Sequence, residues 1–415
     1  MATVKQLPSA QAPDGTTIES FTLSLNGVTA TVCSVGAAIH ELKVPNFADS
    51  SGDTDDVVLG YKTPVDLYHS GNDPYLCVIV GRFANRIAEG KLSLDGKSFT
   101  KLAINNDPNH LHGGPKGFSS KIWTAAIVEV PEVHDCPSTK GVKFTLVSED
   151  GDENYPGKIE VSATYTLVPT TSAAKLCLQM EGKSLDDEKA SPLSLANHSY
   201  FNLGGHNNPK GVMDHKISMH SKKYTPVDKY SIPTREVVSV DAGSGVMNWK
   251  GGKMISDALV AFGQQEAGLS KEQSEQHVAA ASQPGGSTQQ FLSATPEPFN
   301  YGFDHNYVIE KSGSGLNIAG VVEHAETKRR MVVATDAPGV QLYTANYLNG
   351  SNADISKDNT AYGQWQAVCL ETQTYPDSVY VNEKEHEEFA KGKCFILHPG
   401  GEGYRHRVEY RFESI

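Results

Sequence analysis

The chain has 415 residues, and its 49 acidic side chains outnumber 36 basic ones to give a net charge of −13. Nucleic acids and anionic membranes bind proteins through basic clusters that displace counterions from phosphates, so this balance argues against both partners. A small neutral substrate fits better. The apolar content suffices for a large core, and no stretch approaches the roughly 20 apolar residues of a membrane-spanning helix.

Alternation of apolar and polar residues with a period of two dominates the chain. Glycine and proline turns separate these runs, and no long amphipathic helix intervenes. The pattern predicts an all-β fold with antiparallel strands in a sandwich. Length alone suggests two or three domains, although large all-β folds can form one unit. In chain order, strands are expected at Thr29–Ser34, Val57–Leu59, Leu92–Leu94, Lys143–Val147, Ile159–Leu167, Leu176–Met180, Val237–Val240, Tyr307–Ile309, Arg330–Thr335 and Tyr404–Phe412.

Two segments depart from the strand pattern. Residues 251–298 are rich in Gln, Ser, Ala and Gly, with a possible short helix near Ser270–Ala281. Their apolar content is too low for a core of their own, so we interpret them as an inserted, mobile surface segment rather than a second domain. The turn-rich stretch Val133–Lys140 is predicted to be a loop.

The cysteines are scattered and show no CxxC or CxxH spacing, which favours reduced core residues over disulfides or a zinc site. Residues 1–20 lack a basic start followed by an apolar region, so we expect a cytoplasmic protein. The cysteines are Cys33, Cys77, Cys136, Cys177, Cys369 and Cys394.

Two motifs resemble cofactor-binding sites but are better explained by a turn and by hydrogen bonding. Residues 90–98 (GKLSLDGKS) have five residues between the glycines where a phosphate-binding loop needs four, and the Asp95-Gly96 pair predicts a hairpin turn instead. His110 and His112 could share a strand face, but no acidic or cysteine partner lies at metal-site spacing. We therefore expect neither nucleotide nor metal, and a hydrogen-bonding role for His112.

The segment SLANHSYFNLGG places His198 among Asn, Ser and Tyr in a strand-like run, and VCLETQTYPD buries Glu371 in the same way. Imidazole and carboxylate are the side chains that give one proton and take another near neutral pH. The sequence therefore supplies both halves of an acid–base pair.

Four further segments carry side chains suited to a polyhydroxylated ligand. Asn85 and Arg86 lie together in GRFANRIAEG, and His112 lies on the glycine turn LHGG, where backbone can approach a ligand closely. Asp304 follows an aromatic residue in GFDHN, and Gln341 lies on the alternating run GVQLYTAN. Sugar hydroxyls need such polar partners, while the C–H face of the ring needs apolar cover.

These motifs, taken in order, resemble the aldose 1-epimerase (galactose mutarotase) family: GRFANRIAEG, LHGG, NHSYFNLGG, GFDHN, GVQLYTANYLNG and CLETQTYPD. The resemblance runs from about Asp14 to Phe412, interrupted mainly by 251–298. It implies a single domain over residues 1–415, a large antiparallel β-sandwich with few short helices and a sugar cleft across its strands. It also implies exchange of the α and β anomers of free aldohexoses such as glucose and galactose, without a cofactor, by a monomer.

By the same resemblance Glu371 is the general base and His198 the general acid. Asn85, Arg86, His112, Asp304 and Gln341 match positions that hold the sugar hydroxyls and support the pair. The scheme needs an ionised glutamate and a charged histidine before reaction. We expect Asp304 to raise the histidine pKa and Arg86 to keep the glutamate charged.

Three alternatives stay open. A hexose-phosphate epimerase would use the same pair with a basic pocket for the phosphate, to which Lys116 and Arg82 are near enough in sequence. A non-catalytic sugar-sensing module would keep the amide and aromatic contacts but would be expected to lose the acid or the base, and both are present. The scaffold could also isomerise another metabolite by the same proton shuttle.

Overall fold

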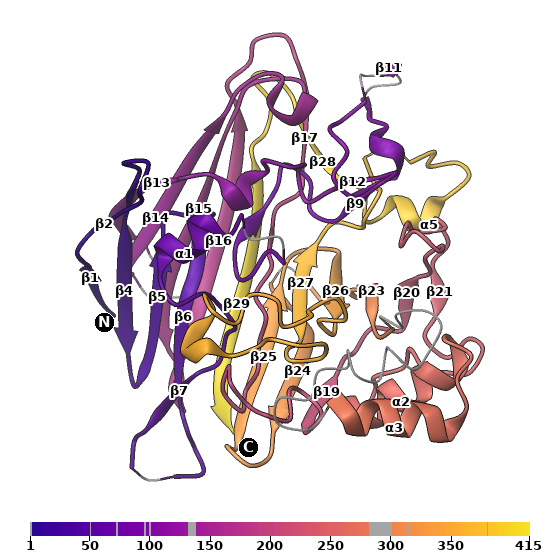
Figure 1. The fold of residues 1–415 in the computed structure, drawn as a ribbon. Coiled ribbons are helices and arrows are strands. Elements are labelled where there is room, and N and C mark those ends of the chain that lie inside the picture. The colour runs from indigo at the N-terminus through magenta and orange to yellow at the C-terminus, as the bar shows by residue number, and fades with distance from the viewer. Residues whose placement is uncertain are drawn as a thin grey trace.

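Antiparallel strands dominate the regular secondary structure of the computed structural model (Figure 1). The model describes residues 2–49, 51–71, 74–94, 97–98, 101–131, 138–281, 301–313, 315–379 and 381–415. The largest sheet has nine strands, and the C-terminal strand β29 lies in its middle between β16 and β25. In spatial order the sheet contains β13 (Thr124–Val130), β14 (Thr139–Ser148), β15 (Ile159–Pro169), β16 (Ala174–Ser184), β29 (Tyr404–Ser414), β25 (Arg329–Thr335), β24 (Asn317–His324), β19 (His215–Ser218) and β22 (Lys253–Met254).

Two five-stranded sheets form the layer opposite the long sheet. Strand β4 of the first sheet contacts β15 of the long sheet, and strand β27 of the second contacts β24 of the long sheet. The first contains β1 (Thr3–Gln6), β4 (Ser20–Leu25), β5 (Val28–Cys33), β6 (Ala38–Pro45) and β7 (Thr54–Asp56). The second contains β21 (Val238–Ser239), β20 (Lys223–Thr225), β23 (Asp304–Val308), β26 (Gly339–Tyr343) and β27 (Cys369–Gln373).

Short elements complete the fold. Five two-stranded ladders pair β2 (Ala10–Gln11) with β3 (Thr17–Ile18), β8 (Ile79–Val80) with β18 (Ala196–Asn197), β9 (Arg86–Ile87) with β12 (His110–Leu111), β10 (Ser93–Leu94) with β11 (Lys97–Ser98), and β17 (Ser191–Leu193) with β28 (Phe395–Leu397). In the described part of the chain the α-helices are α1 (Pro64–His69), α2 (Ile255–Gln265), α3 (Lys271–Ala281) and α5 (Glu387–Ala390). The single 3-10 turns there are η1 (Ala88–Gly90), η2 (Phe118–Ser120), η3 (Asp152–Asn154) and η4 (Lys357–Asn359).

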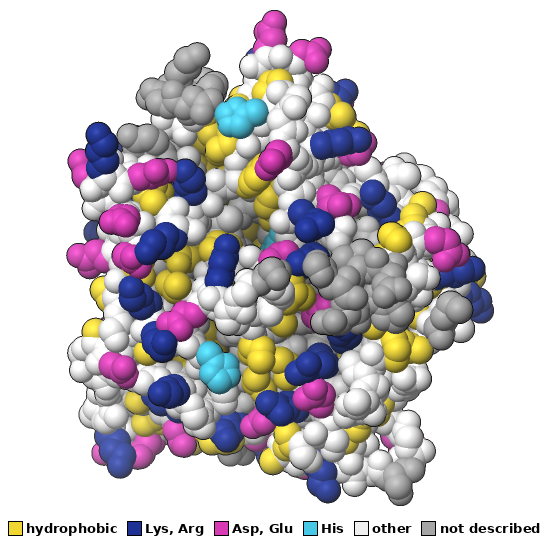
Figure 2. All heavy atoms as spheres, turned by 180° about the vertical axis from the view of Figure 1, so that it is seen from behind, with side chains coloured by type: hydrophobic (Ala, Val, Ile, Leu, Met, Phe, Trp, Pro, Cys, Tyr) yellow, Lys and Arg dark blue, Asp and Glu magenta, His cyan; other side chains and the backbone are white. Residues whose placement is uncertain are grey.

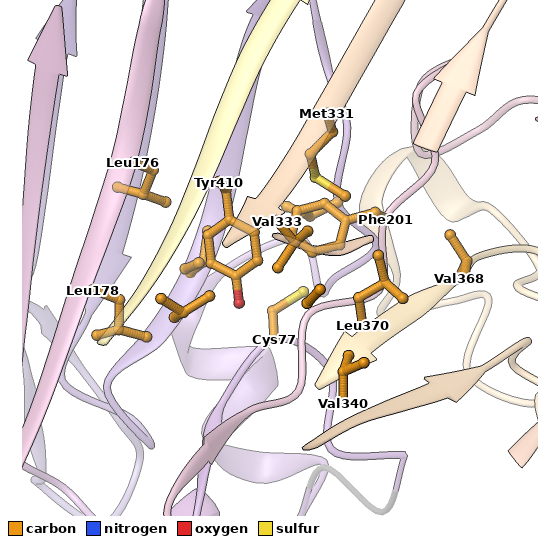
Figure 3. Close-up of a cluster of buried hydrophobic side chains, with 14 of the residues drawn as sticks. Cys77, Leu176, Leu178, Phe201, Met331, Val333, Val340, Val368, Leu370 and Tyr410 are labelled. Atoms are coloured by element: carbon orange, nitrogen blue, oxygen red, sulfur yellow. The ribbon is translucent and has the colours of Figure 1, made fainter. Parts of the chain in front are cut away.

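The core lies between the layers. In Figure 3, Tyr410 of β29 and Met331 and Val333 of β25 lie near Phe201 and Leu370, whose strand β27 belongs to the opposite layer. All five side chains are buried in one continuous apolar cluster. The period of two therefore supplies each sheet with one apolar face, and burial of these faces against each other stabilises the sandwich.

The structure confirms the all-β prediction and most of the expected strands. The hairpin predicted around residues 95–96 is confirmed by the pairing of Leu94 with Lys97. The strand expected at Val57–Leu59 is wrong, because only Val58 forms a bridge there and the strand ends at Asp56. Most of the predicted loop 133–140 lies outside the described residues, and Thr139 already belongs to β14.

The segment 251–281 holds two helices. The short helix expected near Ser270–Ala281 is confirmed as α3. Helix α2 was not predicted, and its Ile255, Leu259 and Phe262 contribute to the main core. A segment with too few apolar residues for a core of its own thus packs its apolar face on the core of the sandwich. Residues 282–298 lie outside the described part of the chain.

Charged side chains of both signs are interspersed on the face shown in Figure 2. No helix among the described residues is long and apolar enough to cross a membrane. Cys33, Cys77, Cys369 and Cys394 are buried free thiols, as predicted, whereas Cys177 is only partly buried and Cys136 lies outside the described residues.

Candidate active site

A cleft of about 600 Å³ opens beside the strands β23 and β27. Six of the seven candidate residues line it, namely Asn85, Arg86, His112, His198, Asp304 and Glu371. Gln341 does not line the cleft, but its side-chain amide donates to Asp304 Oδ1 at 2.7 Å. Segments far apart in the sequence therefore meet at one place, as the motifs predict.

The register of three neighbouring strands places the acidic residues and Gln341. Gln341 of β26 lies directly opposite Glu371 of β27, and Asp304 of β23 lies opposite Tyr343 of β26. Opposite residues, and residues two apart on one strand, share a face of the sheet. Asp304, Gln341 and Glu371 consequently project to the same side, where the cleft lies.

His198 and Glu371 face each other at the floor of this cleft. The imidazole Nε2 lies 3.5 Å from Glu371 Oε2, and both side chains are buried, with exposed fractions of 5% and 3%. Glu371 Oε2 has no hydrogen-bond partner among the described residues. A buried carboxylate oxygen without a partner is costly, so this atom is available to a ligand hydroxyl.

A tight double turn holds Asn85 and His112. Both have left-handed backbone (φ 66° and 50°), and the Asn85 N–H donates to His112 Nδ1 at 3.1 Å. Burial holds the His112 pKa well below its usual range. A neutral imidazole that accepts at Nδ1 must carry its proton on Nε2, so His112 can donate a hydrogen bond but offers no free lone pair at Nε2.

The glycine turn after His112 has a structural reason. At Gly113 (φ 90°) a Cβ atom would lie 1.7 Å from the Gly81 carbonyl oxygen. Glycine is therefore required by the close approach of the chain to Gly81, whereas the sequence suggested close approach to a ligand.

Arg86 joins the amide and carboxylate groups of the site. Its Nε donates to Asn106 Oδ1 at 3.1 Å, and its Nη1 lies 3.6 Å from Asp304 Oδ2. The Asn85 Oδ1 accepts from the Arg86 backbone N–H at 2.8 Å. With Gln341 on the other oxygen of Asp304, these contacts fix the directions of the polar side chains before any ligand binds.

The pKa shifts of the pair in the protein without a ligand run against the expected charges. Burial raises the Glu371 pKa well above its ordinary value, Asp304 raises it further, and Arg86 only partly opposes them. Burial lowers the His198 pKa to about 4, although a hydrogen bond to its own backbone and the charge of Asp304 both oppose this shift. Desolvation outweighs these neighbours and favours the protonated carboxyl of Glu371 and the neutral imidazole of His198.

Aromatic residues of the site were not identified as site residues from sequence. Tyr200 stacks on His198 with ring centroids 5.0 Å apart, and Tyr75 packs on His112 at 4.7 Å. Tyr343 and Tyr347 also line the cleft. The position of Tyr200 two residues after His198 was the available signal, because residues at this spacing share a face of an extended chain.

Neither cation considered for a phosphate lies in the cleft. Arg82 is buried, and its guanidinium donates to the carbonyl oxygens of Pro156, Gly157 and Glu149. Lys116 is exposed and is not among the residues that line the cleft. The cationic side chains that do line it are Arg86 and Lys229.

Two groups of side chains are close enough to share a metal ion, namely His112 with His198 and Glu371, and Asp214 with His215 and His324. The proton on His112 Nε2 disfavours the first. In the second, His215 accepts from the Leu203 N–H through Nε2 and contacts Asp214 through Nδ1, so both of its nitrogens are occupied. The donor atoms therefore fit hydrogen bonding better than metal binding.

An antiparallel sandwich with an imidazole, a carboxylate, amides and aromatic rings around one cleft is suited to an enzyme that acts on a sugar. Comparisons with known proteins agree. The model of the aldose 1-epimerase family matches residues 19–247 and 268–411. The chain is 33% identical to galactose mutarotase from Bos taurus (95% of this chain, 94% of the relative), and 32% identical to that from Homo sapiens (99% of each). It is 29% identical to aldose 1-epimerase from Escherichia coli K12 over 97% of each chain.

Solved structures share the fold. Galactose 1-epimerase from Lactobacillus acidophilus aligns with a TM-score of 0.71 at 22% identity (100% of this chain, 99% of that chain), and an aldose epimerase homologue from C. elegans with 0.70 at 21% (100% of each). The chain belongs to the aldose 1-epimerase family, and it is an isomerase that acts on sugars. The family model leaves 248–267 unmatched; that all of 251–298 is a mobile insertion stays a prediction.

Proposed function

We propose that this protein exchanges the α and β anomers of free aldohexoses, with glucose and galactose as substrates, through Glu371 as base and His198 as acid. The observation that carries the proposal is the approach of His198 Nε2 to Glu371 Oε2 at 3.5 Å on the floor of the cleft. One group can reach the anomeric hydroxyl while the other reaches the ring oxygen of the same pyranose.

In the proposed reaction Glu371 takes the proton of the anomeric hydroxyl, and His198 gives a proton to the ring oxygen. The C1–O5 bond breaks and leaves an open-chain aldehyde. Rotation about C1–C2 and return of both protons close the ring as the other anomer. Each positioned proton transfer contributes on the order of 10²–10⁴ in rate.

The neutral pair that burial favours can enter this scheme without net uptake of a proton. A protonated Glu371 with a neutral His198 holds one proton, and so does an ionised Glu371 with a charged His198. Hydrogen bonds from sugar hydroxyls to Glu371 would stabilise its ionised form, because Oε2 has no partner in the described part of the chain. Substrate binding would thus move the shared proton to His198.

The remaining candidate residues are proposed to hold the sugar. Asn85, Arg86 and Asp304 present amide, guanidinium and carboxylate groups to the cleft, and His112 presents an Nε2–H donor. Gln341 is proposed to act through Asp304, whose carboxylate it orients. Aromatic rings such as Tyr75 supply the apolar surface that the C–H face of a pyranose requires.

Polarimetry tests the proposal directly. Freshly dissolved α-D-glucose and α-D-galactose are followed with wild type, Glu371→Gln and the matched control Glu310→Gln, whose carboxylate is exposed and paired with Lys222. Acceleration by wild type and Glu310→Gln but not by Glu371→Gln supports the function and its base. A folded wild type that accelerates neither sugar overturns the function.

The same assay separates the alternatives. Acceleration restricted to hexose phosphates would indicate a phosphate epimerase, which the placement of Arg82 and Lys116 does not favour. Sugar binding by wild type without anomer exchange would indicate a sensing module, and neither binding nor exchange would direct attention to another metabolite.

We also propose a cytoplasmic, monomeric, single-domain protein. The buried free thiols of Cys33, Cys77, Cys369 and Cys394 support a reducing compartment. Light scattering coupled to gel filtration tests the monomer, and a dimer mass would refute it.

A further inference from the structure

Both ring nitrogens of His198 meet side chains from the same strand. On β27, Glu371 Oε2 lies 3.5 Å from Nε2, and Cys369 Sγ lies 3.8 Å from Nδ1. The two side chains are two residues apart, so they project from the same face of the strand. The thiol is fully buried. It occupies the position at which a carboxylate or carbonyl oxygen commonly orients a catalytic imidazole.

The surroundings fix the plane of the imidazole. The ring of Tyr200 stacks on it at 5.0 Å with an interplanar angle of 19°, and the Tyr200 hydroxyl donates to the Pro74 carbonyl at 2.7 Å. The His198 backbone is bonded on both sides, from its N–H to Val78 O and from the Cys77 N–H to its carbonyl. With the plane fixed, the partners of the two nitrogens determine where the proton resides.

The charges of the pair indicate the direction of the thiol contact. Burial favours the protonated form of Glu371 and the neutral form of His198. A protonated carboxyl 3.5 Å from Nε2 is compatible with a lone pair on that nitrogen. The imidazole proton then lies on Nδ1, where the Cys369 sulfur at 3.8 Å can accept it beside the backbone of His198 itself.

We propose that Cys369 is a positioning residue that accepts a hydrogen bond from Nδ1–H of His198, so that Nε2 is the nitrogen that exchanges the proton with the sugar. This inference rests on the proposed function of His198 as the acid. The Nδ1 proton then stays in place through ring opening and closure, and only the Nε2 proton moves.

A thiol has a consequence that a carboxylate would not have. Sulfur is a weak, uncharged acceptor, whereas a carboxylate at Nδ1 would stabilise the imidazolium through a charge-assisted bond. Cys369 therefore fixes the tautomer without making His198 a weaker acid.

Nitrogen NMR of the histidine side chains tests the tautomer without depending on activity. The His198 signals are assigned by their absence in His198→Asn. At pH 7 we expect Nδ1–H and an unprotonated Nε2 in wild type, a mixture of tautomers in Cys369→Ala, and recovery of Nδ1–H in Cys369→Ser, whose hydroxyl can accept. Cys33→Ala is the matched control, because Cys33 is a buried thiol of the same apolar cluster and its thiol donates to the Val35 carbonyl at 3.9 Å. An Nε2–H signal in wild type overturns the proposal.

Kinetics provide the second readout. For Cys369→Ala we expect a fall in kcat on the order of 10-fold with little change in KM, well short of the roughly 10⁴-fold effect of a wrong tautomer in a serine protease triad. Cys369→Ser should recover most of it, and Cys33→Ala should match wild type. Unchanged kcat in Cys369→Ala overturns the proposal while leaving the function intact, provided that Glu371→Gln is inactive. Absence of activity in wild type instead refutes the function, and the NMR result then still decides the tautomer.

Discussion

Replacing Glu371 by glutamine should abolish catalysis and stabilise the fold at the same time. The amide has nearly the shape of the carboxyl group but can take no proton from the anomeric hydroxyl. Loss of one positioned proton transfer lowers kcat by about 10²–10⁴, which corresponds to about 3–5 kcal/mol of transition-state stabilisation. Binding of the sugar should weaken much less, because Arg86 and Asp304 remain in place.

The gain in stability follows from the raised pKa of Glu371. In the unfolded chain the carboxyl ionises near its ordinary value of 4.5, whereas the folded protein keeps it protonated to higher pH because it is buried. Wild type therefore loses stability as pH rises above 4.5, by about 1.4 kcal/mol per pH unit, until the folded-state pKa is reached. Glutamine does not titrate, so Glu371→Gln escapes this loss.

Urea unfolding between pH 4 and pH 8 measures both curves, with Glu310→Gln as control for an exposed glutamate. We expect the two proteins to have similar stability near pH 4 and Glu371→Gln to become progressively more stable toward pH 8. Parallel curves for wild type and Glu371→Gln would refute the reasoning, since they would mean that the folded protein holds Glu371 ionised.

Three further predictions follow from the site and its supports. His198→Asn should lower kcat by about 10²–10⁴, measured by polarimetry, and near wild-type turnover would contradict its role as acid. The kcat/KM profile should be flat through neutral pH and fall toward pH 4. Below the His198 pKa of about 4 the pair of His198 and Glu371 carries a second proton, so no base remains. A fall centred near pH 6.5 would instead indicate a solvated histidine. Arg82→Leu should cost at least about 3 kcal/mol in urea unfolding, because several buried carbonyl and hydroxyl acceptors lose their donor; a loss under about 1 kcal/mol would show that water replaces the guanidinium.

The candidate residues His198 and Glu371 were accessible from sequence because each lies in a motif with unusual chemistry for a strand, and the family resemblance supplied the roles of the other candidates. A lone glutamate in an apolar run, as at Glu371, predicts a buried carboxylate regardless of which element the strand packs against. Their protonation was not accessible, since it depends on how deeply the cleft buries them. Charged neighbours could be read from the motifs, but desolvation, which outweighs Asp304 and Arg86, is a property of the complete fold.

The same limit applies to the fold. Period-two runs such as Tyr404–Phe412 predicted strands, because alternation is local. Helix α2 was not predicted because its apolar residues are stabilised by contact with the core of the sandwich, which the local sequence does not show. Arg82 gave no local signal of its role either, since its acceptors lie in segments around Ser148, Pro156 and Ser191 that only the fold brings together.

The position of β29 has a consequence for biosynthesis. This strand fills the centre of the largest sheet, hydrogen-bonded to β16 on one side and to β25 on the other. Until the ribosome has released it, both neighbours have open edges, and Tyr410 cannot yet fill the core. Open edges of long strands invite pairing between chains. A truncation before residue 404 should therefore produce aggregates rather than a folded enzyme of lower activity. Slow translation of the preceding residues would prolong the period in which a nascent chain needs a chaperone.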